Sequence, residues 1–115
     1  MSIITIAAAQ HAIQPADCWL DFAALAEQQA STAAGAELLV FAEYGSMGLV
    51  AALAAHERAT LVTQLAGMQK FAEPYCTLFG QLARKNNAWI VAPSFPFAIA
   101  PARYVNRAWI AGPQG

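Results

Sequence analysis

The chain has 115 residues, the size of one ordinary domain, so we expect a single hydrophobic core. Hydrophobic residues make up 58% and charged residues 11%, which excludes a disordered chain, because disorder requires low hydrophobicity and high charge. The net charge of −1, with no basic run, argues against a nucleic acid or an anionic membrane as partner. So few charges cannot cover the surface well, and we expect the chain to meet a partner or to belong to something larger.

The cysteines and the N-terminal residues indicate the cellular compartment in which the chain is expected. Cys18 and Cys76 form no CxxC pair and no disulfide framework, which argues against a disulfide-rich secreted domain and against structural zinc. The N-terminus lacks the positive segment of a signal peptide, and the longest uncharged apolar stretch, residues 44–55, is too short to span a bilayer. These features predict a soluble, cytoplasmic chain.

The first forty residues predict a βαβ unit. Residues 2–9 are almost continuously apolar, which is typical of a strand buried on both faces in a parallel sheet. Apolar residues then recur at steps of three and four between Asp17, a candidate N-cap, and Gly35, which indicates a helix. Residues 37–41 form a second apolar run. A strand, a helix and a strand at this spacing predict a right-handed crossover between parallel strands.

The rest of the chain predicts further helices and two more strands. Pro74 suits the first turn of a helix, and the pair Asn86 and Asn87 is expected to end it. The segment with three prolines is expected to be a connection, and the chain finishes on turn residues. In order, we expect a helix over 58–71, a helix over 74–85, a strand over 89–92, a connection over 93–101, a strand over 103–111 and a turn over 112–115.

Glu43 is the most informative residue for chemistry. It follows the apolar run of the second expected strand, and open α/β sheets bind ligands outside the carboxyl ends of their strands. Partial desolvation at such a position raises the pKa of a carboxyl group toward the range of a general base. The alternative is that Glu43 caps the following helix or pairs with an arginine at the surface.

Four segments, taken together and in order, carry a resemblance. They are the opening strand that ends at Gln10, residues 34–44 around Glu43, residues 82–84 leading to 89–94, and residues 104–108 leading to the Gly-Pro-Gln-Gly turn at 112–115. This order resembles the N-terminal part of the nitrilase, or carbon–nitrogen hydrolase, superfamily, over nearly all of the chain. The resemblance implies an α/β fold equal to the first half of an α-β-β-α sandwich, with about four strands and three helices. Residues 1–115 would then be the N-terminal part of one hydrolase domain, truncated after the fourth strand.

The resemblance also implies a mechanism. Members of the superfamily use a Glu-Lys-Cys triad, in which the glutamate is a general base, the lysine stabilises the tetrahedral intermediate and the cysteine forms a thioester. By its position in the family-like segment, Glu43 matches the glutamate, and the chemistry agrees, because a thiol needs a base within reach to become a thiolate. The implied partner is a small-molecule amide, favoured over a nitrile. A homo-oligomer that pairs through helical surfaces is expected, and neither a metal nor an organic cofactor is implied.

Two departures from the family pattern matter. Ala42 stands where the family usually has proline, which leaves the turn freer in the unfolded chain. In the family the triad lysine lies shortly after the turn that here ends at Gly115, and the cysteine lies further on, so the resemblance implies that neither is among these residues. Lys70 and Lys85 match no catalytic lysine, and Cys18 and Cys76 are interpreted as packing residues. On this reading the 115 residues alone should not turn over substrate.

Several interpretations remain open. Tyr44 is a candidate substrate-binding residue, although plain packing explains it equally well. Asn106 occupies a family-like position, although an asparagine in a strand more often bonds neighbouring backbone. The chain could instead be a short non-catalytic association module, or an unrelated flavodoxin-like binding domain, against which the absence of a glycine-rich phosphate loop argues. Because half of a sandwich leaves one sheet face bare, we expect the isolated chain to self-associate.

Overall fold

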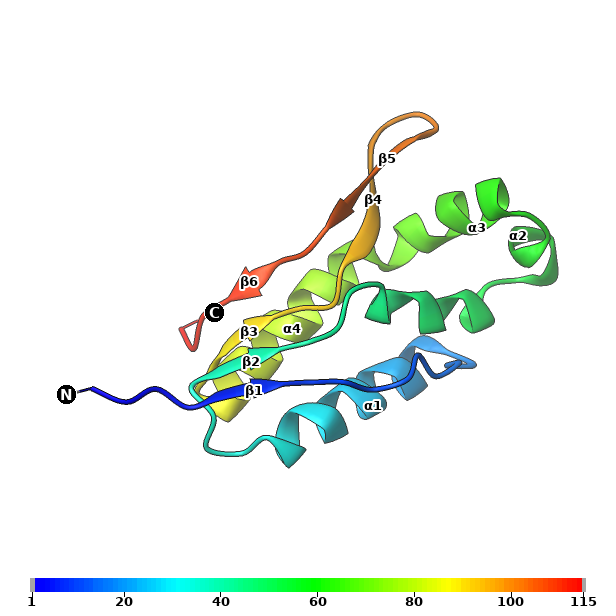
Figure 1. Ribbon diagram of the computed structural model, residues 1–115. Helices are drawn as coiled ribbons and strands as arrows, with labels where there is room; N and C mark the ends of the chain where they lie inside the picture. Colours follow the sequence, from blue (N-terminus) through cyan, green and yellow to red (C-terminus); the bar gives the residue numbers. More distant parts are fainter. Residues whose placement is uncertain (1, 115) are drawn as a thin grey trace.

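The computed structural model describes residues 2–114 and contains one four-stranded sheet, one two-stranded sheet and a layer of helices (Figure 1). The large sheet has the strand order β1-β2-β3-β6. The elements along the chain are β1 (Ile6–Ala8), α1 (Trp19–Thr32), β2 (Leu38–Val40), the 3-10 helix η1 (Gly45–Ala52), α2 (Ala55–Arg58), α3 (Leu61–Met68), the 3-10 helix η2 (Gln69–Phe71), α4 (Ala72–Asn86), β3 (Trp89–Val91), β4 (Phe95–Ala100), β5 (Arg103–Arg107) and β6 (Ile110–Ala111).

The predicted α/β class and its βαβ start are confirmed. β1 pairs in parallel with β2, with Ala7 opposite Leu39, and β2 pairs in parallel with β3, with Leu39 opposite Ile90. β6 closes the sheet as an antiparallel edge strand. Residues 2–114 hold six strands and four α-helices, more than the sequence predicted, because a hairpin was missed and short helices precede α4.

The missed hairpin lies where the sequence predicted a connection. Residues 95–100 form β4, which pairs antiparallel with β5 and places Pro96 opposite Asn106. Proline is tolerated at the edge of a sheet, and both strands of a two-stranded sheet are edges, so the prolines do not prevent pairing. The single strand predicted over 103–111 is divided into β5 and β6, which belong to different sheets.

The helix boundaries follow local chemistry with three corrections. The single helix predicted over 58–71 is divided into the end of α2, α3 and η2, because Thr60 leaves the helical conformation and caps the start of α3. α4 begins at Ala72, so Pro74 occupies the third helical position, where a backbone N–H has no intrahelical acceptor. Asn87 ends α4 in the left-handed conformation with φ 48°, as its predicted role as a stop requires. The N-cap of α1 is Cys18 rather than Asp17, and no side chain caps that end.

The core lies between one face of the large sheet and the helices α1 and α4. Leu39 and Ile90 point into it and are 3% and 0% exposed. Tyr75 of α4 is fully buried at its centre, with its ring centroid 4.9 Å from that of Phe79 and 5.0 Å from that of Phe95. Its hydroxyl donates a 2.6 Å hydrogen bond to the Pro93 carbonyl, and burial raises the pKa of this phenol well above its ordinary value.

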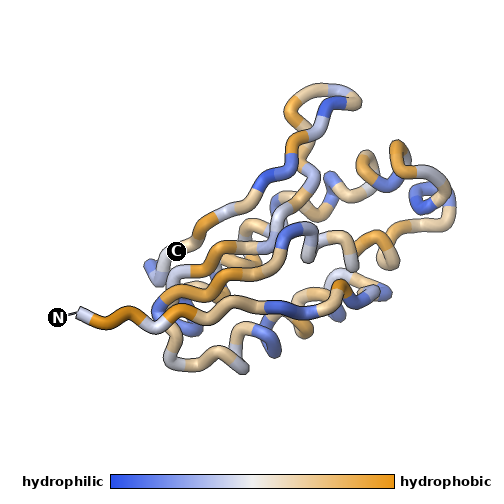
Figure 2. Tube along the Cα trace, viewed as in Figure 1, coloured by the Kyte–Doolittle hydropathy of each residue, from blue (hydrophilic) through white to orange (hydrophobic). Residues whose placement is uncertain are grey.

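The opposite face of the large sheet is apolar and open. Ile6, Trp89 and Ile110 are 57%, 54% and 69% exposed, and Figure 2 colours much of the parallel strands as hydrophobic. The expectation that the first strand is buried on both faces is therefore wrong, because within residues 2–114 the helices cover only one face. No helix in this part of the chain is long and apolar enough to cross a membrane.

Candidate active site

Glu43 lies just beyond β2, at the carboxyl ends of the parallel strands. Phe41 prolongs the pairing of β2 with β3, because its N–H donates to the Val91 carbonyl at 3.0 Å, and the chain then turns away. The Glu43 side chain is exposed and borders a hollow at this edge of the sheet, so the expected partial desolvation of its carboxylate is wrong. The hollow is lined by Phe41, Glu43, Val91, Ala92, Ser94, Asn106 and Ala108.

Asn106 of β5 reaches the Glu43 carboxylate. Its Nδ2 donates a hydrogen bond of 3.1 Å to Oε1 of Glu43, across 63 positions of sequence. The expectation that Asn106 bonds neighbouring backbone is wrong. The alternative roles for Glu43 are absent as well within residues 2–114, since no arginine pairs with it and the N-cap of η1 is Tyr44, without a side-chain cap.

The turn that carries Glu43 is fastened to the segment after β3. Tyr44 adopts the left-handed conformation with φ 59°, which costs a residue with a side chain about 1–3 kcal/mol. Its N–H donates to Oγ of Ser94 at 2.7 Å, and the Ser46 hydroxyl donates to the Ser94 carbonyl at 2.7 Å. Both serines are buried, so these bonds form away from competing water and hold the turn in its strained shape.

Gly45 lets this turn approach the end of β3. A Cβ atom at Gly45 would lie 2.6 Å from Cβ of Pro93, closer than any packed side chain permits. Pro93 is itself held by the hydrogen bond that its carbonyl accepts from the buried Tyr75 hydroxyl. The buried core of α4, the end of β3 and the Glu43 turn therefore form one connected unit.

The other candidate residues lie elsewhere. Tyr44 as a whole residue is 47% exposed and is not among the residues that line the hollow. Cys76 is partly buried on α4, and burial raises the pKa of its thiol, which favours an unreactive packing residue. Cys18 is exposed at the start of α1, so its interpretation as a packing residue is wrong.

The two lysines are engaged in ion pairs on the helical side. Lys70 pairs with Glu57 at 2.8 Å, and Lys85 pairs with Glu27. Neither of them lines the Glu43 hollow. Among residues 2–114, no three His, Cys, Asp or Glu side chains come together in a way that could hold a metal ion.

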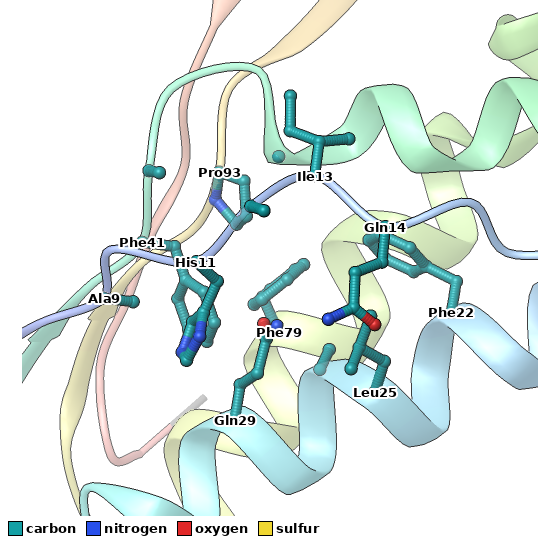
Figure 3. Close-up of a pocket in the computed structure, with 14 residues that line it drawn as sticks. Ala9, His11, Ile13, Gln14, Phe22, Leu25, Gln29, Phe41, Phe79 and Pro93 are labelled. Atoms are coloured by element: carbon teal, nitrogen blue, oxygen red, sulfur yellow. The ribbon is translucent and has the colours of Figure 1, made fainter.

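A second hollow lies behind the Glu43 turn, between the loop after β1 and helix α1. Phe22, Phe41 and Phe79 supply an aromatic lining, and the polar side chains of His11 and Gln29 lie beside it (Figure 3). Ala42 and Gly45 belong to its wall, so the turn separates the two hollows. Within the described part of the chain, no carboxylate and no thiol lines the second hollow.

Sequence reasoning missed the contribution of the two serines. Ser46 and Ser94 are uncharged, common residues in segments interpreted as loops, and nothing in their local pattern marks them as buried. Only the position of Ser94 shortly after the strand predicted over 89–92 hints at a role. Their pairing depends on two chain segments 48 positions apart, which periodicity does not reveal.

These features define an α/β protein in which a carboxylate-bearing turn stands at the carboxyl edge of parallel strands. The chain matches the family model described as carbon-nitrogen hydrolase over residues 5–115, and it therefore belongs to the carbon-nitrogen hydrolase family. This membership confirms the resemblance noted in the sequence, and the flavodoxin-like alternative is wrong. No curated protein and no solved structure matches the chain significantly.

Proposed function

We propose that this chain supplies the general base of a hydrolase that cleaves a non-peptide carbon–nitrogen bond, and that Glu43 is that base. The observation that carries the proposal is the place of the Glu43 carboxylate, at the carboxyl edge of the sheet beside a hollow and held by an amide donor. A carboxylate on a braced turn is suited to repeated proton transfer, because its position does not have to be recovered in each cycle.

The proposed reaction follows the thioester route of the family. Glu43 takes the proton of a cysteine thiol, and the thiolate attacks the carbon of an amide. A lysine stabilises the resulting tetrahedral oxyanion, and the protonated glutamate returns the proton to the departing nitrogen. Glu43 then takes a proton from water, which attacks the thioester, releases the carboxylic acid and regenerates the thiol. An amide is the proposed substrate rather than a nitrile, and Tyr44 is a proposed substrate contact.

The lysine and the cysteine must come from outside these 115 residues. Among residues 2–114, Glu43 is the sole titratable residue that lines the hollow, since the other lining residues are apolar or carry a hydroxyl or an amide. We therefore propose that the chain is the N-terminal part of a single hydrolase domain, and that the complete protein is a homo-oligomer. The coding sequence after Gly115 tests this proposal directly. A lysine after the next strand and a cysteine further on are expected, whereas a stop codon would contradict it.

The decisive functional experiment is Glu43→Gln in the complete translated protein, with ammonia release from acetamide, propionamide and benzamide as the assay. Loss of a general base is expected to reduce turnover about 100-fold to 10,000-fold, with the fold retained because the side chain is exposed. Glu73→Gln, at an exposed glutamate of α4, is the matched control and should keep full activity. Unchanged turnover in Glu43→Gln would mean that another group is the base.

The open apolar sheet face favours a second candidate function. A non-catalytic association module would use that face to bind another protein and would need no triad. On this alternative the complete protein releases no ammonia from any amide, and Glu43→Gln leaves its binding unchanged.

A further inference from the structure

We propose that Asn106 is a positioning residue for the Glu43 carboxylate, an inference that rests on the proposed role of Glu43 as general base. Asn106 holds one carboxylate oxygen, Oε1, through the 3.1 Å hydrogen bond from its Nδ2. Within residues 2–114, the other oxygen of Glu43 receives no hydrogen bond. The hydrogen bond to Oε1 therefore orients the carboxylate, and Oε2 stays free to accept and return the proton.

The chemistry of an amide suits this role. A lysine or an arginine at the same place would favour the charged form of the carboxylate strongly and so weaken it as a base. An amide donates a directed hydrogen bond without a full positive charge, and it neither gains nor loses a proton in the working range of pH. Asn106 therefore aims the carboxylate while leaving it able to accept a proton.

The hairpin brings Asn106 to this position and is itself fixed from the helical side. In the β4–β5 pairing, Asn106 lies opposite Pro96. The side-chain amide of Gln69 in η2 then bonds β4 twice, because its Nε2 donates to the Pro96 carbonyl at 2.6 Å and its Oε1 accepts from the Ala98 N–H at 2.9 Å. The Gln69 side chain thus satisfies backbone groups of β4 as the backbone of a neighbouring strand would. The hairpin is therefore held in place independently of the contact between Asn106 and Glu43.

The exposure of Asn106 and Glu43 distinguishes a role in positioning the carboxylate from a role in stabilising the fold. Asn106 and Glu43 are both exposed, and a hydrogen bond between exposed groups contributes little to stability because water replaces it when it is lost. The fold already has the buried serine pair and the Tyr75 hydroxyl to hold the turn. Loss of the amide should therefore affect the aim of the carboxylate and leave the fold intact.

The test compares Asn106→Leu, which keeps the size and removes the donor, with Val105→Leu on the same strand but on its opposite side. Both variants are made in the complete translated protein and assayed with the three amides above. Asn106→Leu is expected to lower kcat about 10-fold to 100-fold, the cost of a misaimed catalytic group, with KM and the melting temperature nearly unchanged. Val105→Leu should match the unmodified protein. Unchanged kcat in Asn106→Leu, or a loss that follows a fall in melting temperature, overturns the proposal.

A second measurement needs no activity and separates this inference from the proposed function. Asparagine side-chain amides labelled with ¹⁵N are followed by NMR as the pH is lowered. The Asn106 signals should respond to acid in the unmodified protein and should not respond in Glu43→Gln. If they do not respond in the unmodified protein, the inference fails even if the enzyme is active. If they respond but no amide is hydrolysed, the contact stands and the proposed reaction fails.

Discussion

The two faces of the large sheet differ in what this chain provides for them. Ile90 of β3 and Ile110 of β6 are the same residue type on adjacent strands, yet Ile90 is 0% exposed and Ile110 is 69% exposed. Helices α1 and α4 cover the first face, and nothing in residues 2–114 covers the second to the same extent. The hydrophobic composition therefore serves two purposes, an internal core and an open surface, and only one of them is completed within this part of the chain.

The largest expected effect tests this difference with one substitution at each isoleucine. Ile90→Ala should destabilise the fold by about 2–5 kcal/mol, because it leaves a cavity against α4. Ile110→Ala should change stability by no more than about 0.5 kcal/mol, as for other surface positions. Urea unfolding of both variants gives the two values. Equal losses would mean that the open face is covered in solution and that the contrast between the faces disappears.

A smaller loss of stability is expected at Gly45, where the Glu43 turn packs against Pro93. Gly45→Ala should cost about 1–3 kcal/mol, because its Cβ would overlap the Pro93 ring. Gly80→Ala is the matched control, since a Cβ at Gly80 in α4 meets no atom within 4 Å and should stabilise the helix by about 0.5–1 kcal/mol. Thermal unfolding measures both, and stabilisation in both variants would mean that the turn is not packed against Pro93.

The open face should affect association more than stability. Ile6 and Ile110 are exposed and point away from the helices. Replacing both with serine therefore makes the open face less apolar without disturbing the core. The double variant of the 115-residue chain should self-associate less and bind less of a hydrophobic dye, with an unfolding midpoint near that of the unmodified chain. Light scattering after size-exclusion chromatography measures the association. An unchanged mass distribution would assign any self-association to another surface, such as the helices.

The smallest effect concerns an ion pair that lies on neither face. The hydrogen bond from Lys70 is the main cause that lowers the pKa of Glu57 below its ordinary value of 4.5. A carboxylate with a lowered pKa in the fold contributes stability above its ordinary value, and that contribution is lost as the pH falls through the lowered one. Lys70→Met should therefore lower the melting temperature slightly at neutral pH and not at all in strong acid. Lys70 is exposed and Glu57 is only partly buried, so water screens the pair and the expected shift in melting temperature is the smallest of the set.

The sequence by itself was enough for the βαβ start, the parallel pairing, the end of α4 at Asn87 and the place of Glu43 at the edge of the sheet. The strands and helices follow from local periodicity, and the end of α4 follows from a turn residue, so each can be recognised within a short stretch of chain. The place of Glu43 then follows from the rule that open sheets bind ligands at the carboxyl ends of their strands. The family resemblance was also carried by short segments in order.

Only the tertiary structure decided that residues 95–100 form a strand, that Asn106 binds Glu43, and that two buried serines hold the turn. Each of these contacts joins segments that are far apart in the sequence, except for the hairpin, where proline was a misleading local signal. Which side of an apolar strand is covered was likewise undecided, because β1 is apolar on both sides and only the packing of α1 and α4 distinguishes them. Local patterns determine the elements and their order, whereas contacts between distant residues depend on how those elements pack.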